Sequence, residues 1–300
     1  MAVFASAALA AHTGKLELAI RHVLAGLGHG IHAGRERGAG VEFSEYRAYA
    51  PGDEWRRVDW KLMARADRYY VREAERDSHV AVWLVLDATA SMGEPSRSIS
   101  GLDKLGYARL LLGCVGAIAQ RQGDAFGLVV CHGERAHFTP ASRGPRQLQR
   151  VLSQLERVEA AGTLPGSEVL RASLHFARAP SVVCVAGDFL EWPSPLSEAM
   201  IRLRGMRHDV RALCLQTEAE IAADFDAAQA WRDPEGDGKL FRFGREARSE
   251  YARKRGEHFE MLARQCRAHD IPYTAAPIER APGEVLRSWL QTRLNARGGR

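Results

Sequence analysis

Three oxygen-bearing side chains stand at every second position directly after the first strongly apolar segment of the chain. They are Asp87, Thr89 and Ser91, and the segment before them is 79–86, HVAVWLVL. A short segment that is apolar at nearly every position is typical of a β-strand buried on both faces, so we expect the three side chains where that strand ends. One carboxylate and two hydroxyls that converge there would suit a hard cation such as Mg²⁺ or Mn²⁺.

Two later residues could complete such a site. Thr163 lies in the short loop 162–166 before an expected helix, and Asp188 follows a later buried segment, 182–186. Open α/β sheets bind ligands at the carboxyl ends of their strands. We therefore predict a metal site built from Asp87, Thr89, Ser91, Thr163 and Asp188. The alternative is that the two aspartates only cap helices and accept hydrogen bonds from turn amides, as acids at strand ends often do.

Apolar segments alternate with amphipathic segments from about residue 80 to the end of the chain. The expected strands are 79–86, 126–131, 182–186, 210–215 and 271–275, and the expected helices are 104–120, 145–158, 167–178, 195–204, 245–268 and 282–294. Strands that alternate with helices predict a mostly parallel sheet covered by helices on both faces. The expected fold class is therefore α/β, with a doubly wound sheet of the Rossmann type.

The order and spacing of the five candidate ligands resemble the metal-ion-dependent adhesion site of von Willebrand factor A domains. This resemblance implies that the hydroxyls of Thr89, Ser91 and Thr163 contact the metal and that the two aspartates act largely through water. Thr89 stands where that family usually has a serine, which keeps the hydroxyl and adds a methyl group. A metal held in this way would keep an open coordination position for an acidic side chain of a partner protein.

The first 78 residues differ in character from the rest of the chain. A helix is expected over 16–27, and a glycine- and arginine-rich stretch and then a polar, aromatic stretch follow it. We expect short strands and turns attached to the sheet rather than a separately folded domain. The predicted division is an N-terminal extension, residues 1–78, and a von Willebrand factor A-like domain, residues 79–300.

A block of charged, aromatic and glycine residues in this extension resembles the motif that precedes the A-type domain in the "domain of unknown function 58" family. It consists of Gly38, Gly40, Glu42, Phe43, Arg47, Tyr49, Pro51, Gly52, Asp53, Arg56, Arg57, Asp59, Trp60, Ala64 and Arg65, and the segment 232–235 is similar to a later part of the same family. Members are commonly linked with MoxR-type AAA+ ATPases, which implies such an ATPase as partner. The charges of the block could pin the extension to the sheet through ion pairs or could contact the partner directly.

Composition excludes several other classes of protein. Apolar residues make up 46% and charged residues 26% of the 300 residues, which is typical of a globular chain. No segment is apolar for long enough to cross a membrane, and the five cysteines form no CxxC pair. Reduced, buried cysteines and the lack of a basic leader predict a cytoplasmic protein. The net charge is +5 and the basic clusters contain acids, so we do not expect nucleic-acid binding.

The leading hypothesis is a non-enzymatic, metal-dependent protein-interaction module, an adaptor or co-chaperone that works with a MoxR-type ATPase. A metal-assisted, phosphatase-like hydrolase is the first alternative, because the same ion could polarise a phosphoryl group. The motifs supply no dedicated catalytic base or nucleophile for that reaction, and no P-loop or G-x-S-x-G pattern occurs. A structural scaffold with a degenerate metal site is the second alternative.

Overall fold

The protein divides into two compact units. The computed structural model describes residues 16–31, 45–49, 60–66, 68–73, 81–174, 180–224, 231–232, 240–241 and 245–291. Residues 1–30 and 80–300 form the first unit, and residues 31–79 form the second. The end of the second unit lies next to the boundary predicted at 78/79, but the N-terminal helix belongs to the first unit.

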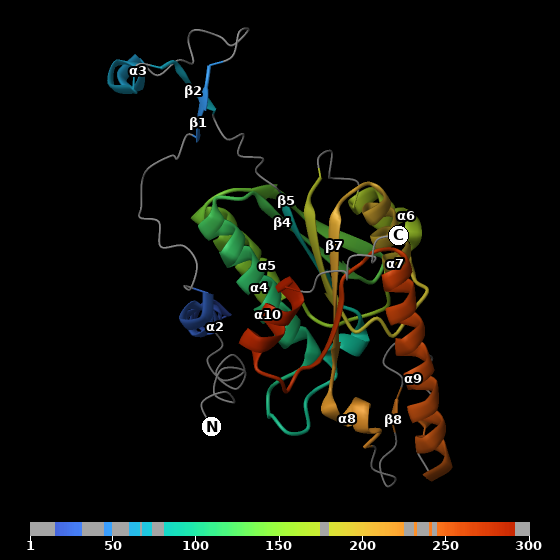
Figure 1. Ribbon diagram of the computed structural model, residues 1–300. Coiled ribbons are helices and arrows are strands. Elements are labelled where there is room, and N and C mark those ends of the chain that lie inside the picture. The colour runs from blue at the N-terminus through green and yellow to red at the C-terminus, as the bar shows by residue number, and fades with distance from the viewer. Residues whose placement is uncertain are drawn as a thin grey trace. The chain divides into compact units, whose positions relative to one another are not determined.

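The first unit is built on a six-stranded sheet (Figure 1). Its strands are β3 (Val82–Asp87), β4 (Phe126–His132), β5 (Arg135–Ser142), β6 (Val182–Gly187), β7 (Asp209–Gln216) and β10 (Tyr273–Pro277). Their order across the sheet is β10-β7-β6-β3-β4-β5, and every neighbouring pair is parallel apart from β4 and β5. From β3 the chain proceeds to one edge through β4 and β5, and then to the other edge through β6, β7 and β10. The strand order therefore reverses between β3 and β6.

Helices cover both faces of this sheet. One face carries α2 (Leu16–Ile31), α4 (Lys104–Gln122), α5 (Pro145–Arg157) and α10 (Pro282–Gln291), and the other carries α6 (Ser167–Ser173), α7 (Pro195–Gly205) and α9 (Arg245–Ala268). Alternate side chains of β3 point to opposite faces of the sheet. Leu84 and Leu86 pack in the core on the first face, and Trp83 and Val85 pack in the core on the second. The predicted doubly wound, mostly parallel α/β fold is confirmed.

The N-terminal helix α2 is part of the first core. Ile20, Val23 and Leu27 are buried in the cluster that also holds the apolar face of α4. At Gly113 of α4 a Cβ atom would lie 2.5 Å from Ile20 Cδ1, so the glycine lets the two helices approach closely. The predicted helix over 16–27 therefore exists and is tied to the α/β unit.

The structure differs from the sequence expectation at several short elements. The edge strand β5 and the five-residue helix α8 (Glu218–Ala222) were not expected. In the second unit, β1 (Glu45–Ala48) and β2 (Tyr70–Glu73) are the expected short strands, and they pair with each other in a two-stranded sheet of their own. α3 (Trp60–Ala66) completes the unit's described elements. β8 (Trp231–Arg232) and β9 (Leu240–Phe241) form a further antiparallel pair.

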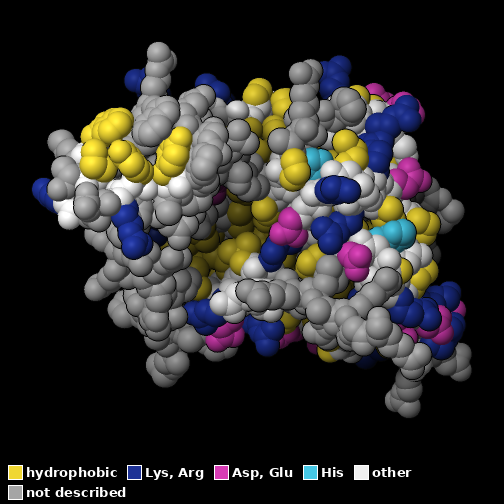
Figure 2. Space-filling model, turned by 45° about the horizontal axis from the view of Figure 1, so that its top comes forward, with side chains coloured by type: hydrophobic (Ala, Val, Ile, Leu, Met, Phe, Trp, Pro, Cys, Tyr) yellow, Lys and Arg dark blue, Asp and Glu magenta, His cyan; other side chains and the backbone are white. Residues whose placement is uncertain are grey.

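Charged side chains of both signs lie next to one another on the described surface (Figure 2). On α9 two ion pairs join residues four apart, Arg253 with Glu257 at 2.8 Å and Lys254 with Glu250 at 2.7 Å. Pairs of this kind keep a basic helix face from presenting one sign of charge. None of the described helices is long and apolar enough to cross a membrane.

Candidate metal centre

Asp87, Thr89 and Ser91 lie together at the point where the strand order reverses. Asp87 is the last residue of β3, Thr89 is the residue that precedes the 3₁₀ helix η2 (Ala90–Gly93), and Ser91 lies in the first turn of η2. Asp87 Oδ1 accepts hydrogen bonds from Thr89 N at 3.0 Å and from Thr89 Oγ1 at 2.9 Å. The hydroxyl oxygens of Thr89 and Ser91 are 3.1 Å apart. All three side chains are buried.

Asp87 packs directly against the backbone of the neighbouring strand β6. The facing residue is Gly187, where a Cβ atom would lie 2.7 Å from Asp87 Cβ and 2.8 Å from Asp87 Oδ2. Any larger residue at 187 would have to displace the carboxylate. The glycine at the end of β6 therefore makes room for the acid at the end of β3.

The Thr163 loop is fastened beside this turn by backbone hydrogen bonds. Ala90 N donates to Gly162 O at 2.9 Å, and Gly133 N donates to Thr163 O at 2.7 Å. Gly162 has a φ of +63°, a left-handed conformation that glycine adopts without strain. These bonds place the backbone of the loop next to the turn, but the Thr163 side chain is exposed and does not line the cavity described below, so its role as a ligand stays a prediction.

Asp188 is brought to the site but is already paired with a lysine. Its Oδ2 atom lies 2.8 Å from Lys104 Nζ, and the same ammonium lies 3.0 Å from Glu220 Oε1. Burial opposes the charge on Lys104, but the two carboxylates outweigh burial and raise the pKa of the ammonium above its usual value. Neither Lys104 nor Glu220 was predicted to lie at this site. The one available signal was a lysine at the first position of an expected helix, where the helix dipole disfavours a cation.

The two aspartates line one small cavity. Its volume is about 10 Å³, and Asp87, Thr89, Leu164, Asp188 and Ser194 are among the residues around it. A space of this size holds about one water-sized particle. The predicted ligands of β3 and β6 therefore share a space that a single ion or water molecule could fill.

The oxygen atoms of the turn are hydrogen-bonded to one another at separations that are also compatible with a small octahedral cation. Mg²⁺ binds oxygen at about 2.0–2.1 Å, so neighbouring ligands on an octahedron lie about 3 Å apart. The separations of 2.9 Å from Asp87 Oδ1 to Thr89 Oγ1 and 3.1 Å from Thr89 Oγ1 to Ser91 Oγ match this value. Within the described residues no three His, Cys, Asp or Glu side chains gather as metal ligands. Hydroxyls must therefore supply part of any ligand set here, and metal binding stays a prediction.

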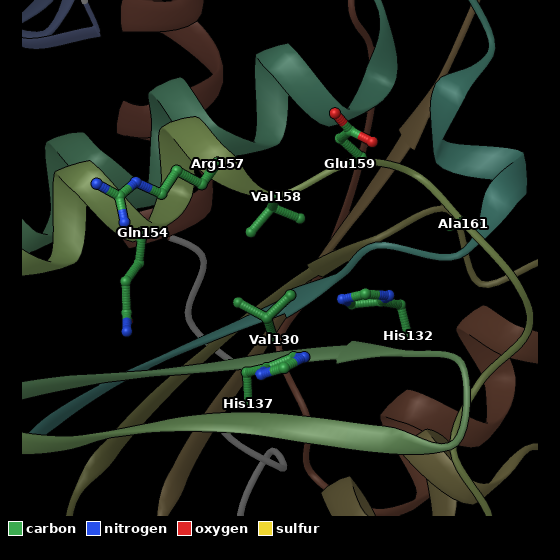
Figure 3. Close-up of a pocket in the computed structure, with 8 residues that line it drawn as sticks. All are labelled: Val130, His132, His137, Gln154, Arg157, Val158, Glu159 and Ala161. Atoms are coloured by element: carbon green, nitrogen blue, oxygen red, sulfur yellow. The ribbon is translucent and has the colours of Figure 1, made fainter.

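A larger cavity of about 490 Å³ is lined by residues of β4, β5 and α5 and of the segment that follows α5. Figure 3 shows His132 and His137 beside Val130, with Val158 drawn above them. The two imidazole rings are stacked with centroids 5.4 Å apart, and burial together with His137 lowers the pKa of His132. Ala161, which also lines the cavity, donates its N–H to Ala88 O, so the cavity and the turn share a wall.

Part of the N-terminal motif block lies within the second unit. The ring of Tyr69 meets Tyr49 and Trp60 edge to face, at centroid distances of 6.2 Å and 6.4 Å. Tyr49 N also donates to Tyr69 O at 2.9 Å. Gly38, Gly40, Glu42, Phe43, Pro51, Gly52, Asp53, Arg56, Arg57 and Asp59 lie outside the described residues. The ion-pair network of the block therefore stays a prediction.

Several solved structures are similar to this chain. The conserved hypothetical protein BatB from Bacteroides thetaiotaomicron is 14% identical with a TM-score of 0.42, and the match covers 71% of this chain and 99% of that one. The SpRpn10 VWA domain is 8% identical with a TM-score of 0.43, covering 73% and 99%. An aerotolerance-related membrane protein from Bacteroides fragilis is 14% identical with a TM-score of 0.43, covering 71% and 98%. Identities and TM-scores are low, and the fold described above rests on the sheet itself.

Relatives in sequence extend over most of the chain. Two uncharacterized proteins, from Mycobacterium bovis and Mycobacterium tuberculosis, are each 26% identical over 281 residues, which is 91% of this chain and 86% of the relative. The family model described as "Protein of unknown function DUF58" matches residues 45–261, more than half of the chain. The family resemblance drawn from the motif block is thereby confirmed, and this chain belongs to the DUF58 family.

Proposed function

We propose that this protein is a non-enzymatic protein-interaction module that holds Mg²⁺ or Mn²⁺ at Asp87, Thr89, Ser91, Thr163 and Asp188. The observation that carries the proposal is the spacing of the Asp87, Thr89 and Ser91 oxygens, 2.9 Å and 3.1 Å, at the topological switch point of the sheet. A bound ion would offer an open coordination position to an acidic side chain of the partner.

The chain's own residues prepare this position. Asp87 fixes the Thr89 hydroxyl by accepting its hydrogen bond, and η2 directs Ser91 toward that hydroxyl. Hydrogen bonds from Ala90 N and Gly133 N hold the backbone of the exposed Thr163 loop next to the turn after β3. The ligand turn therefore needs little reorganisation when an ion enters, which favours binding.

The partner and the cellular address are further parts of the proposal. Because the chain is a DUF58 protein, we take a MoxR-type AAA+ ATPase as the first partner to test, with this chain as its adaptor or co-chaperone. A cytoplasmic address is consistent with Cys114, Cys131, Cys184, Cys214 and Cys266, which are all free and buried.

A second candidate function, a scaffold without a metal, is favoured by one observation. Lys104 already supplies a positive charge to Asp188 at 2.8 Å, so this acid has a counter-ion from the protein itself. In that case the exposed Thr163 loop and the turn after β3 would bind a partner through hydrogen bonds alone.

Calorimetry separates the two candidates. We expect wild type to bind one Mn²⁺ or Mg²⁺, Ser91→Ala to bind it at least about tenfold more weakly, and Asp87→Asn to bind none. Ser142→Ala is the matched control, since Ser142 is exposed and pairs with Phe126 at the opposite end of β4 from Asp87's partner Cys131. Wild type that binds neither ion would leave the scaffold as the function.

Capture of the partner tests the rest of the proposal. We expect purified MoxR-type ATPase to be retained by immobilised wild type in Mg²⁺ and to be lost in EDTA or with Asp87→Asn. Equal recovery in Mg²⁺ and in EDTA would contradict metal-dependent binding. No recovery under any condition would contradict the choice of partner.

A further inference from the structure

Lys104 is a buried, charged side chain in contact with Asp188 of the candidate metal centre. It is the first residue of α4 and is 1% exposed. A helix N-terminus disfavours positive charge, and burial disfavours any charge that lacks a partner. The ammonium is therefore stable at this position because Asp188 and Glu220 flank it at 2.8 Å and 3.0 Å.

Both acids use their second oxygen elsewhere. Glu220 Oε2 accepts a hydrogen bond from Thr217 N at 2.7 Å and so caps α8, and Asp188 Oδ1 accepts a longer one from Leu190 N at 3.4 Å. Lys104 thus joins the end of β6 to the start of α8. Of its two partners, Asp188 also faces the small cavity that Asp87 lines.

Lys104 sets the charge that an entering cation would meet. Asp87, Asp188 and Glu191 line the cavity and Glu220 pairs with Lys104, so four carboxylates and one ammonium leave three negative charges in the group. A divalent ion would cancel two of these charges. Without Lys104 the same ion would meet one more negative charge, which would strengthen its binding and weaken its attraction for a further carboxylate.

We propose that Lys104 is a positioning residue that acts as the built-in counter-ion of Asp188. It keeps this carboxylate turned toward the protein and out of direct contact with the metal, so that the ion retains enough positive charge to accept a partner's acidic side chain. This inference rests on the proposed function and deepens it. It implies that removing Lys104 changes metal binding and carboxylate binding in opposite directions.

The test uses Lys104→Met, which keeps the length of the side chain and removes the charge. We expect calorimetry to show that this variant binds Mn²⁺ at least roughly tenfold more tightly than wild type does. Acetate is the carboxylate probe: it should displace water from Mn²⁺-loaded wild type, seen as a fall in water-proton relaxation, and should do so less in the variant. A merely structural lysine would weaken both kinds of binding together.

Two further variants keep the test decisive. Lys254→Met removes one exposed lysine on α9, paired with Glu250, and should leave Mn²⁺ and acetate binding unchanged. In Lys104→Met/Glu220→Gln the half-buried acid at 220 is also neutralised, so only Asp188 loses its counter-ion. This double variant should fold more readily than Lys104→Met, and it keeps Asp188 free for the ion. We expect this double variant also to bind Mn²⁺ more tightly than wild type.

The outcomes distinguish this inference from the proposed function. Wild type that binds Mn²⁺, together with folded Lys104 variants that bind it no more tightly, would overturn the role of Lys104 alone. Wild type that binds no ion, together with Lys104 variants that do, would support the counter-ion role and refute the proposed metal-dependent function. No binding to any of these proteins would refute both.

Discussion

Replacing Gly187 by alanine perturbs the contact on which the position of Asp87 depends. The new Cβ atom would lie 2.7 Å from Asp87 Cβ and 2.8 Å from Asp87 Oδ2, well inside ordinary van der Waals separation. Forcing a methyl group into a packed interior costs about 1–3 kcal/mol. The reduced freedom of the unfolded chain offsets about 0.4–1 kcal/mol of this. The difference between these two ranges has a central value of about 1.3 kcal/mol and an upper end of about 2.6 kcal/mol, so we expect the variant to be less stable by about 1 kcal/mol or more.

Urea unfolding in EDTA measures this difference without any contribution from metal binding. The control is Gly256→Ala, in the middle of α9, where a Cβ atom meets nothing within 4 Å. A glycine in a helix interior is about 0.5–1 kcal/mol less favourable than alanine, so the control should be more stable than wild type. Under the proposed function, Gly187→Ala should also weaken Mn²⁺ binding because it displaces the Asp87 carboxylate, and Gly256→Ala should not.

Equal stability of wild type and Gly187→Ala would refute this reasoning. Gly187 has no left-handed φ that would penalise alanine for its backbone, so the predicted loss comes from the contact alone. A stable variant would mean that Asp87 can turn away from β6 at no cost. A destabilised variant with unchanged Mn²⁺ affinity would confirm the packing and contradict a role for Asp87 in binding the ion.

Two further predictions concern other buried groups. Tyr107 is buried and donates to Arg280 O at 2.6 Å, so Tyr107→Phe should lower the free energy of unfolding by about 1–2 kcal/mol in urea titrations; an unchanged value would contradict this bond. His137→Ala should raise the pKa of His132, followed by NMR, because His137 contributes with burial to lowering it. Since the folded-state pKa of His132 lies below its unfolded value, this histidine contributes stability at neutral pH that is lost as the pH falls below about 6.5 and through the folded-state pKa. A His132 pKa that stays constant in His137→Ala would show that burial alone lowers it.

The fold could be predicted because its central strands are buried on both faces. All six residues of β3 are buried, and the continuous apolar run before Asp87 is the direct trace of that burial. The edge strand β5 pairs with β4 alone and is exposed at most positions, with Thr139 its one buried residue. A polar segment that includes Pro140 has no such trace, so β5 could not be recognised.

Some residues of the candidate site could be predicted to meet, and others could not. Asp87 and Asp188 directly follow buried strands, and strand ends on neighbouring parallel strands meet at one edge, so their approach could be predicted. Lys104 lies at a helix start, and its partner Glu220 lies in a helix of five residues. Their meeting depends on β6 lying between β3 and β7, which alternation of strands and helices does not specify.

Acidic side chains follow the carboxyl ends of four neighbouring strands of the sheet. Asp87 ends β3, Asp188 follows β6, Glu220 lies in α8 after β7, and Glu279 follows β10, where it accepts hydrogen bonds from Ser96 Oγ at 2.7 Å and from Glu218 N at 3.1 Å. The ammonium of Lys104 enters this row between the second and third acids. Because the row exists only in the folded strand order, the electrostatics of this edge are a property of topology. A change of charge at one strand end should therefore alter the affinity for an ion at the neighbouring strand end. The local sequence around Asp87 alone does not reveal this coupling.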